Sequence, residues 1–92
     1  MPKPSDYLRK GWCQRHSAVD EQGYDTPATS PTATKWCVYG AIEAAYPHDM
    51  EKSMTLVQTL YIHMGTHLVA RWNDEPGRTQ KEAIALLEAI GE

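Results

Sequence analysis

The strongest pattern in this sequence is a stripe of small apolar side chains. It predicts a helix over residues 31–45, because apolar residues recur at steps of three and four. Ser30 and Pro31 have the composition of a helix start, and Tyr46-Pro47 that of a stop. Since Gly and Ala permit close approach, we interpret the stripe as an internal contact, with a homodimer seam as the alternative. Its members are Ala33, Trp36, Cys37, Gly40, Ala41, Ala44 and Ala45.

Three further helices are predicted from capping residues and breaks. Ser5 is the expected N-cap of a short helix that continues to Lys10. Asp49 is the expected N-cap of a helix whose apolar stripe continues to Leu68, with an end near Met64, before Gly65, as the alternative. The last helix opens with a capping box and closes at Gly91. The apolar residues expected on the third helix are Leu56 and Leu60 beside Met54, Val57, Tyr61, Met64 and Leu68, and the capping box pairs Thr79 with Glu82.

The predicted fold class is mainly α, a compact bundle of about four helices. We expect a single helical domain over residues 1–92, with residues 1–4 as a flexible tail. Residues 12–29 lack helical periodicity and form either an irregular loop or a short hairpin around the turn Asp20–Gly23.

Composition excludes several classes of protein. Among the 92 residues, 41% are hydrophobic and 23% charged, which is too apolar for a disordered chain. No apolar run approaches the roughly 20 residues of a membrane-spanning helix. The first residues have no apolar signal region, and two cysteines cannot form a disulfide-rich scaffold. We therefore expect a cytoplasmic protein, in the host cytoplasm if a phage encodes it.

The net charge of −3 argues against nucleic acid as a partner. Basic residues exceed acidic ones only in the first 16 residues, so the rest of the chain is acidic. We interpret that short basic segment as a solvated helix face. We expect no nucleic-acid or membrane partner.

The expected core depends on tryptophan, because the sequence has no phenylalanine. Each indole buries a large area and carries an N–H that needs an acceptor. We therefore expect the tryptophans to fix loops onto helices, although Trp72 is also suited to a partly exposed interface. The predicted core residues are Trp12, Trp36, Cys37, Gly40, Ala41, Leu60 and Leu87.

The two cysteines each follow a tryptophan, and we interpret them as buried thiols. The alternative is a structural zinc site, for which the available thiols and imidazoles are Cys13, His16, Cys37, His63 and His67. The spacing includes only one C-x2-H pair. We therefore predict no metal, no cofactor and no catalytic residues.

The densest polar cluster in the chain lies at residues 72–79. One interpretation is the chemistry of a helix–turn–helix connection, in which these side chains cap free backbone groups. The other is an exposed partner-binding loop, for which the candidate residues are Trp72, Asn73, Asp74, Glu75 and Arg78.

An ordered set of short motifs resembles an uncharacterised family of small proteins. The set is Gly11-Trp12-Cys13-Gln14, Gly23, Ser30-Pro31, Trp36-Cys37-x-x-Gly40-Ala41, Trp72-Asn73-Asp74-x-Pro76-Gly77-Arg78-Thr79 and a closing Leu86-Leu87 helix, over residues 8–90. The resemblance is to proteins of unknown function from bacteria, notably actinobacteria, and their phages. It implies a phage or mobile-element context and no particular activity.

These observations favour a non-enzymatic protein-interaction module over an enzyme. A small phage accessory protein of this kind would bind a host protein and inhibit it, a component of a defence system for example. The alternative is a zinc-stapled structural domain that uses Cys13, His16, Cys37 and a further histidine. The chain is expected to be a monomer or a homodimer.

Overall fold

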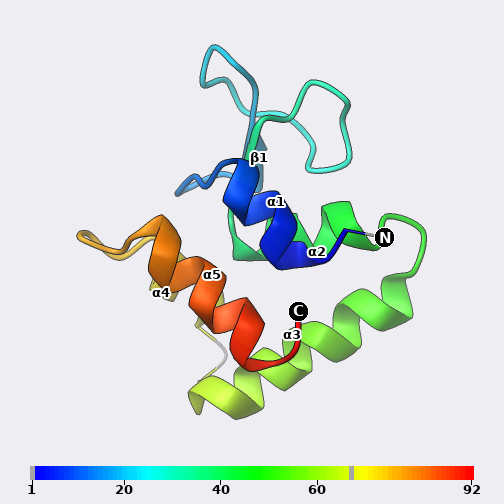
Figure 1. Cartoon of the computed structure of the whole chain (residues 1–92), viewed down its shortest axis with the longest axis vertical. Helices are drawn as coiled ribbons and strands as arrows, with labels where there is room; N and C mark the ends of the chain where they lie inside the picture. The colour runs from blue at the N-terminus through cyan, green and yellow to red at the C-terminus, as the bar shows by residue number, and fades with distance from the viewer. Residues whose placement is uncertain (1, 67) are drawn as a thin grey trace.

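The computed structural model describes residues 2–66 and 68–92. In this part of the chain it contains five helices and a two-stranded antiparallel sheet (Figure 1). The helices are α1 (Pro4–Lys10), α2 (Val38–Ala45), α3 (Met50–Met64), α4 (Val69–Asn73) and α5 (Gln80–Ala89). The strands are β1 (Ala18–Val19) and β2 (Lys35–Trp36). The prediction of a mainly helical fold is therefore confirmed.

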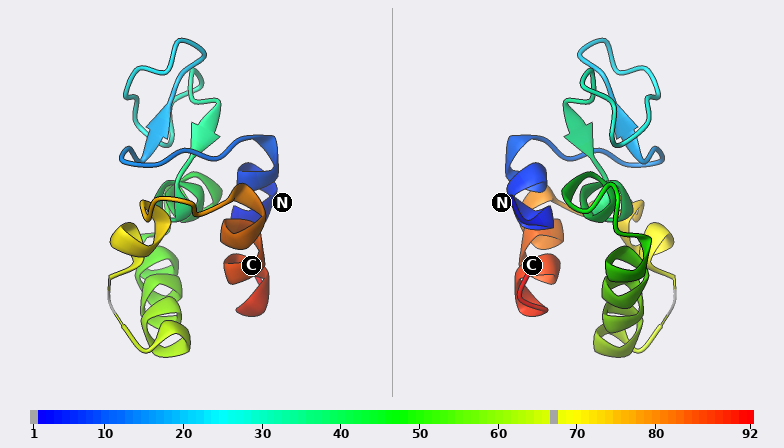
Figure 2. Two further views of the ribbon diagram at one scale, coloured as in Figure 1. Left: turned by 90° about the vertical axis from the view of Figure 1, so that its left-hand side faces the viewer. Right: turned by 90° about the vertical axis from the view of Figure 1, so that its right-hand side faces the viewer.

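Helix α2 has a central position in the fold, because it contacts α1, α3 and α4. Helix α1 packs against α2 and α5, while α3 and α4 each contact α2. Residues 12–36, which contain β1 and β2 and which we call the irregular segment, lie at one end of the molecule, and α3 and α5 extend toward the other (Figure 2). The two ends of the chain meet, since the Ser5 backbone N–H and hydroxyl both donate to the carbonyl of Glu92.

One hydrophobic cluster joins these elements. Apolar side chains from all five helices of the described chain contribute to it, and because they are removed from water they supply most of the driving force for folding. Those with the least exposure are Leu8, Val38, Ile42, Leu60, Val69 and Leu87. No helix in the described residues is long and apolar enough to span a bilayer.

The predicted helix over residues 31–45 is wrong in its first half. Residues 35–36 form β2, paired antiparallel with β1 in the register Ala18↔Trp36, and α2 begins only at Val38. Trp36 also forms a parallel bridge with Trp12, and its indole donates to the carbonyl of Ala28 at 3.0 Å. These tertiary contacts hold Trp36 in an extended conformation, so periodicity alone assigned it incorrectly.

Two further differences from the prediction concern the residues at which α1 and α2 begin. The N-cap of α2 is Cys37, whose Sγ accepts a hydrogen bond from the Gly40 N–H at 3.3 Å, while Ser30 lies in a turn. Helix α1 begins at Pro4 with Lys3 at the N-cap position, because the Asp6 carboxylate accepts a hydrogen bond from the Lys3 N–H. Ser5 is therefore not the cap; it is buried against the carboxyl-terminal residue.

The remaining local predictions agree with the structure. Asp49 caps α3, which ends at Met64, and Thr79 forms the capping box of α5 with Glu82. The turn at Asp20–Gly23 is present, although β1 pairs mainly with the distant β2. Helix α4 was not predicted.

Two glycines are required by close approach of the chain to itself. A Cβ on Gly40 would lie 1.8 Å from the Ser17 carbonyl oxygen, and one on Gly11 would lie 2.5 Å from the Thr34 carbonyl oxygen. The absence of a side chain at these two positions therefore lets the irregular segment pack closely against α2 and the end of α1. The small-residue stripe of α2 is thus internal, as Gly40 and Ala41 are buried.

Candidate functional site

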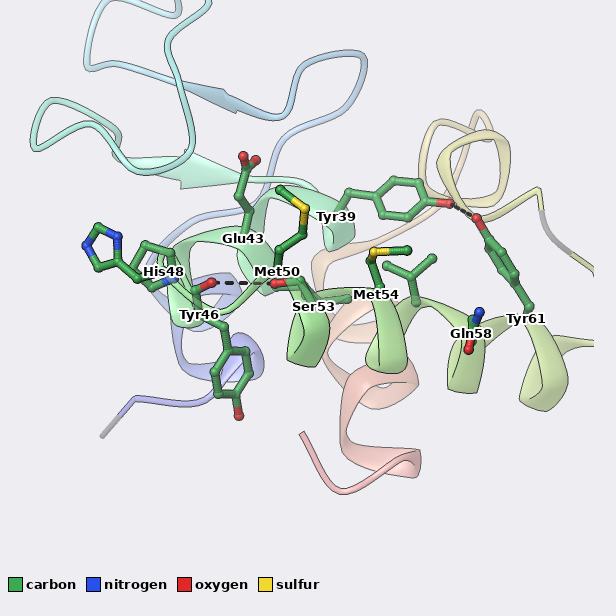
Figure 3. Close-up of a pocket in the computed structure, with 12 residues that line it drawn as sticks. Tyr39, Glu43, Tyr46, His48, Met50, Ser53, Met54, Gln58 and Tyr61 are labelled. Atoms are coloured by element: carbon green, nitrogen blue, oxygen red, sulfur yellow. Dashed lines mark hydrogen bonds between the residues drawn. The ribbon is translucent and has the colours of Figure 1, made fainter.

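An open apolar groove of about 670 Å³ lies between α2 and α3 (Figure 3). We call it the α2/α3 groove. Helix α2 contributes Tyr39, Ile42 and Glu43 to it, and the α2–α3 turn contributes Tyr46, Pro47 and His48. The residues from α3 are Met50, Ser53, Met54, Val57, Gln58 and Tyr61.

The groove exists because α3 has two apolar faces. Leu56 and Leu60 face the core and are buried, whereas Met50 is 77% exposed and Met54 58% exposed. Residues 50, 54, 57 and 61 repeat at steps of three and four, which places them along one side of the helix. Together with Leu56 and Leu60, this row forms an apolar arc on α3 that is wider than the surface one neighbouring helix can cover. The width of the arc was the sequence signal that could have identified the groove.

Polar groups in the groove are partly satisfied within the chain. The Tyr39 and Tyr61 hydroxyls form a hydrogen bond at 3.2 Å at one end, and the Ser53 hydroxyl donates to the Tyr46 carbonyl at the other. Desolvation, together with the hydrogen bond to Tyr61, raises the pKa of Tyr39. The Tyr46 ring points away from the groove, and its hydroxyl donates to the Glu92 carboxylate at 2.7 Å. The groove therefore presents mainly thioether, aliphatic and aromatic surface.

Charge around the groove is acidic. Glu43 lines it and is exposed, and Asp49 and Glu51 are exposed at the start of α3. Glu51 is seven residues before Gln58, which places both on one stripe of the helix. Lys52 is directed elsewhere, because its ammonium lies 5.5 Å from the Tyr46 ring centroid and 3.9 Å from the Glu92 carboxylate.

The polar cluster at residues 72–79, interpreted above as a helix connection or as a partner-binding loop, holds three chain segments together. Asn73 is only 1% exposed, and its side chain forms four hydrogen bonds. Its Oδ1 accepts from the Trp12 indole at 2.8 Å and from the Val38 N–H at 3.2 Å. Its Nδ2 donates to the Cys13 carbonyl and to the Asp74 carboxylate. Asn73 is thus inaccessible to a partner.

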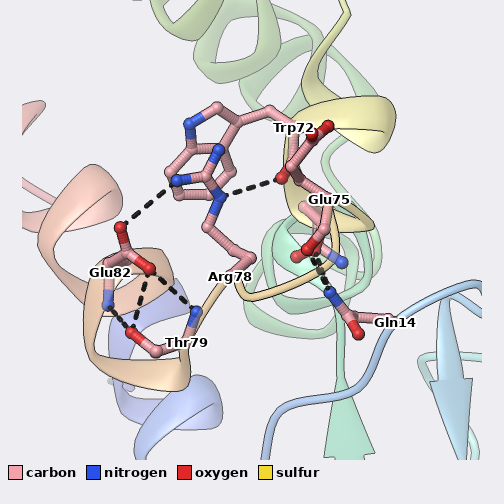
Figure 4. Close-up of polar contacts among 7 residues, drawn as sticks. Gln14, Trp72, Glu75, Arg78, Thr79 and Glu82 are labelled. Atoms are coloured by element: carbon pink, nitrogen blue, oxygen red, sulfur yellow. Dashed lines mark hydrogen bonds and ion pairs between the residues drawn. The ribbon is translucent and has the colours of Figure 1, made fainter.

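Neighbours of Asn73 are also engaged internally (Figure 4). The Asp74 carboxylate accepts from the Arg15 backbone N–H at 2.8 Å, and the Gln14 amide donates to the carbonyls of Asn73 and Glu75. These contacts attach the irregular segment to the α4–α5 turn. Glu75 contributes its backbone, so its exposed side chain is available to solvent.

Arg78 stacks on Trp72. Its guanidinium carbon lies 4.0 Å from the Trp72 ring centroid, and its Nε donates to the Trp72 carbonyl at 3.0 Å. An ion pair with Glu82 at 3.2 Å completes the arrangement. A hydrogen bond from the Thr79 N–H lowers the pKa of Glu82. The cation covers Trp72, so this half-buried ring serves the α4–α5 turn.

The two thiols lie close together but have little thiolate character. The Cys13 N–H donates to the Trp36 carbonyl, which places Cys13 beside Cys37. Desolvation, and secondarily the nearby Cys37, raises the pKa of Cys13 to about 12. Desolvation also raises the pKa of Cys37. Because the thiolate is the nucleophile, both groups are poorly reactive at neutral pH.

The other residues considered for zinc are distributed over the molecule. The His16 imidazole contacts the Asp25 carboxylate at 3.1 Å, and His63 is exposed in the last turn of α3. His67 lies outside the described residues. In the described part of the chain, no three side chains of His, Cys, Asp or Glu are grouped so that they could hold a metal ion.

Fold and site together define a small mainly helical protein with an apolar groove and a polar junction that joins its irregular segment to its helices. The chain belongs to a family of unknown function, DUF6197, which it matches over residues 5–92. This match confirms membership in a family of unknown function over nearly the whole chain. Neither a curated protein nor a solved structure gave a significant match.

Proposed function

We propose that the protein is a non-enzymatic interaction domain that binds another protein through the α2/α3 groove. The observation that carries this proposal is the exposure of Met50 and Met54 beside an apolar wall. Methionine side chains are unbranched and polarizable, so they adapt to the surface of a partner. Leaving them in water is unfavourable by about 25 cal/mol per Å² of apolar area, and a partner that covers them recovers this free energy.

The polar side chains support the same proposal. Trp72, Asn73, Asp74 and Arg78 are engaged in contacts that hold the fold together. The raised pKa of Cys13 disfavours nucleophilic catalysis by its thiol. The chain's exposed apolar groove is then its best-suited surface for function.

We extend the proposal to the biological setting through the resemblance to actinobacterial and phage proteins. In that setting the protein is a phage or mobile-element accessory protein in the host cytoplasm, and its partner is a host protein that it inhibits. A gene position beside phage early genes would support this extension. A position within an operon of metabolic enzymes would contradict it.

The groove is tested by affinity capture from an actinobacterial lysate with matched variants. Met54→Glu places a charge in the groove, whereas Ile62→Glu places the same charge on α3 at a side chain that is 84% exposed and does not line the groove. We expect a stoichiometric partner that the wild type and Ile62→Glu capture and Met54→Glu does not. Equal capture by all three proteins, or capture by none, would contradict the proposal. Circular dichroism confirms that both variants fold.

A further inference from the structure

We propose that the occupant of the α2/α3 groove is a basic amphipathic helix of about three turns, supplied by a partner protein. This inference rests on the proposed function and specifies the chemistry of the partner. Length, backbone hydrogen bonding and charge each contribute to it.

The length follows from α3. The groove extends along this helix from Met50 to Tyr61. Twelve helical residues span about 17 Å at 1.5 Å per residue, which matches about three turns of a partner helix. The Tyr39–Tyr61 hydrogen bond closes one end of the groove.

Backbone hydrogen bonding favours a helical partner. Both walls of the groove are helices, whose interior N–H and C=O groups are already bonded within each helix. An extended peptide would find no strand edge here, and each of its buried backbone groups would lose hydrogen bonds to water. A helix satisfies its own backbone and presents only side chains, as in other helix-in-groove complexes.

Charge favours lysine or arginine on that helix. Glu43 lines the groove near the end where α2 meets α3, and the exposed residues Asp49 and Glu51 flank the lining residue Met50 in the chain. The last turn of α2 contains no basic residue of its own, so the negative end of its dipole adds to the acidic character of this end. Lys52, the basic residue nearest in sequence, is paired with Glu92. A partner cation would therefore meet several negative groups.

The same charges disfavour a second copy of this chain as the occupant. A two-fold contact places the same patch on both subunits. Glu43 and Glu51 of one copy would then lie near the same acidic patch of the other, and like charges repel. A partner of opposite charge avoids this repulsion.

The test uses labelled synthetic peptides and fluorescence polarisation. The probe is a 14-residue helix with leucine on one face and lysine on the other, and its control carries glutamate in place of lysine. We expect the Leu/Lys peptide to bind at least 10-fold more tightly than the Leu/Glu peptide, with an affinity that falls as salt rises. A third peptide with a central proline, which breaks the helix, should bind at least 10-fold more weakly.

Matched variants locate the binding. Neutralising Glu43 in the groove and Glu51 beside Met50, with Glu43→Gln and Glu51→Gln, should weaken binding of the Leu/Lys peptide about 3- to 10-fold. The control pair Glu21→Gln and Glu75→Gln removes the same charge from exposed positions that do not line the groove and should change affinity less than 2-fold. Met54→Glu, which adds a negative charge, should still weaken binding because it disrupts the apolar contact, whereas Ile62→Glu should not.

Failures of this inference and of the proposed function are distinguishable. If Met54→Glu abolishes partner capture but the Leu/Lys peptide binds no better than the Leu/Glu or proline peptides, the groove binds a protein of other chemistry and the inference is wrong. Equal weakening by both double variants would also overturn it, because binding would then reflect net charge alone. If capture is insensitive to Met54→Glu and no peptide binds, the proposed function itself fails.

Discussion

Replacing Asn73 with alanine removes a side chain that joins three segments of the chain. The Trp12 indole and the Val38 N–H would lose their acceptor, and the Cys13 carbonyl would lose a donor. A buried polar group without a partner costs about 1–3 kcal/mol. Trp12 and Cys13 are only half-buried, so water recovers part of their loss. We therefore expect Asn73→Ala to lower the free energy of unfolding by about 3–5 kcal/mol.

The assay is urea unfolding followed by tryptophan fluorescence and circular dichroism. For a domain of this size, each 1 kcal/mol corresponds to about 4–8 °C in Tm, so the Tm should fall by about 12–40 °C. Gln14→Ala is the matched control, since its amide bonds to backbone carbonyls of the same junction with partial access to water. It should cost less than about 1 kcal/mol. A loss below about 1 kcal/mol for Asn73→Ala would refute the reasoning.

Asn73→Asp nearly preserves the shape of the side chain but changes its hydrogen bonding, so it distinguishes the two contributions to stability. It retains an acceptor for Trp12 and Val38 but replaces the Nδ2 donor with an oxygen that faces the Cys13 carbonyl and the Asp74 carboxylate. The charged form is disfavoured there, so the pKa of the new carboxyl is raised in the folded state. Stability of this variant should then decrease as the pH rises above about 4, and recover at lower pH relative to Asn73→Ala.

Three other changes have definite expected outcomes. Gly40→Ala brings a methyl group to 1.8 Å from the Ser17 carbonyl oxygen, and the resulting overpacking should cost about 1–3 kcal/mol in urea unfolding. Arg78→Ala removes the stack on Trp72 and should cost about 1–2 kcal/mol, while Arg78→Lys should restore less than half of that loss, because lysine lacks the planar guanidinium. At alkaline pH, the folded chain keeps protons on Cys13 and Tyr46 up to a pKa of about 12, whereas unfolded cysteine ionises near 9.0 and tyrosine near 10.0. The contribution of these two groups to the free energy of unfolding should therefore be fully present below about pH 9 and should decrease between pH 9 and pH 12. The Cys13→Ser variant should show a smaller decrease between pH 9 and 10.

Local chemistry was sufficient to predict α3 and α5. Asp49 and Thr79 each accept a hydrogen bond from the backbone N–H three residues later, and this contact depends only on residues within one turn. The break after Met64 was likewise predicted from a single glycine. Such signals are readable because both partners in the interaction are neighbours in the sequence.

The candidate site could be predicted only in part. The stripe that contains Met54, Val57 and Tyr61 is visible in the sequence. The spacing alone, however, does not determine which apolar face of α3 packs against the core and which remains exposed. The structure places Leu56 and Leu60 against the core and leaves Met54 in the groove. Asn73 was a candidate for partner binding, and its burial depends on acceptor and donor groups 35 to 61 residues away.

The sequence by itself determined that the protein is mainly helical, where α3 and α5 start, and which residues are chemically able to form a junction. Tertiary structure decided that Trp36 is extended rather than helical, that Asn73 is internal, and that α2 and α3 leave a groove open. The physical reason is the range of the interactions. Caps and turns are satisfied within a few residues, whereas Trp36 adopts its conformation through pairing with Trp12 and Ala18, contacts that exist only once distant segments have come together.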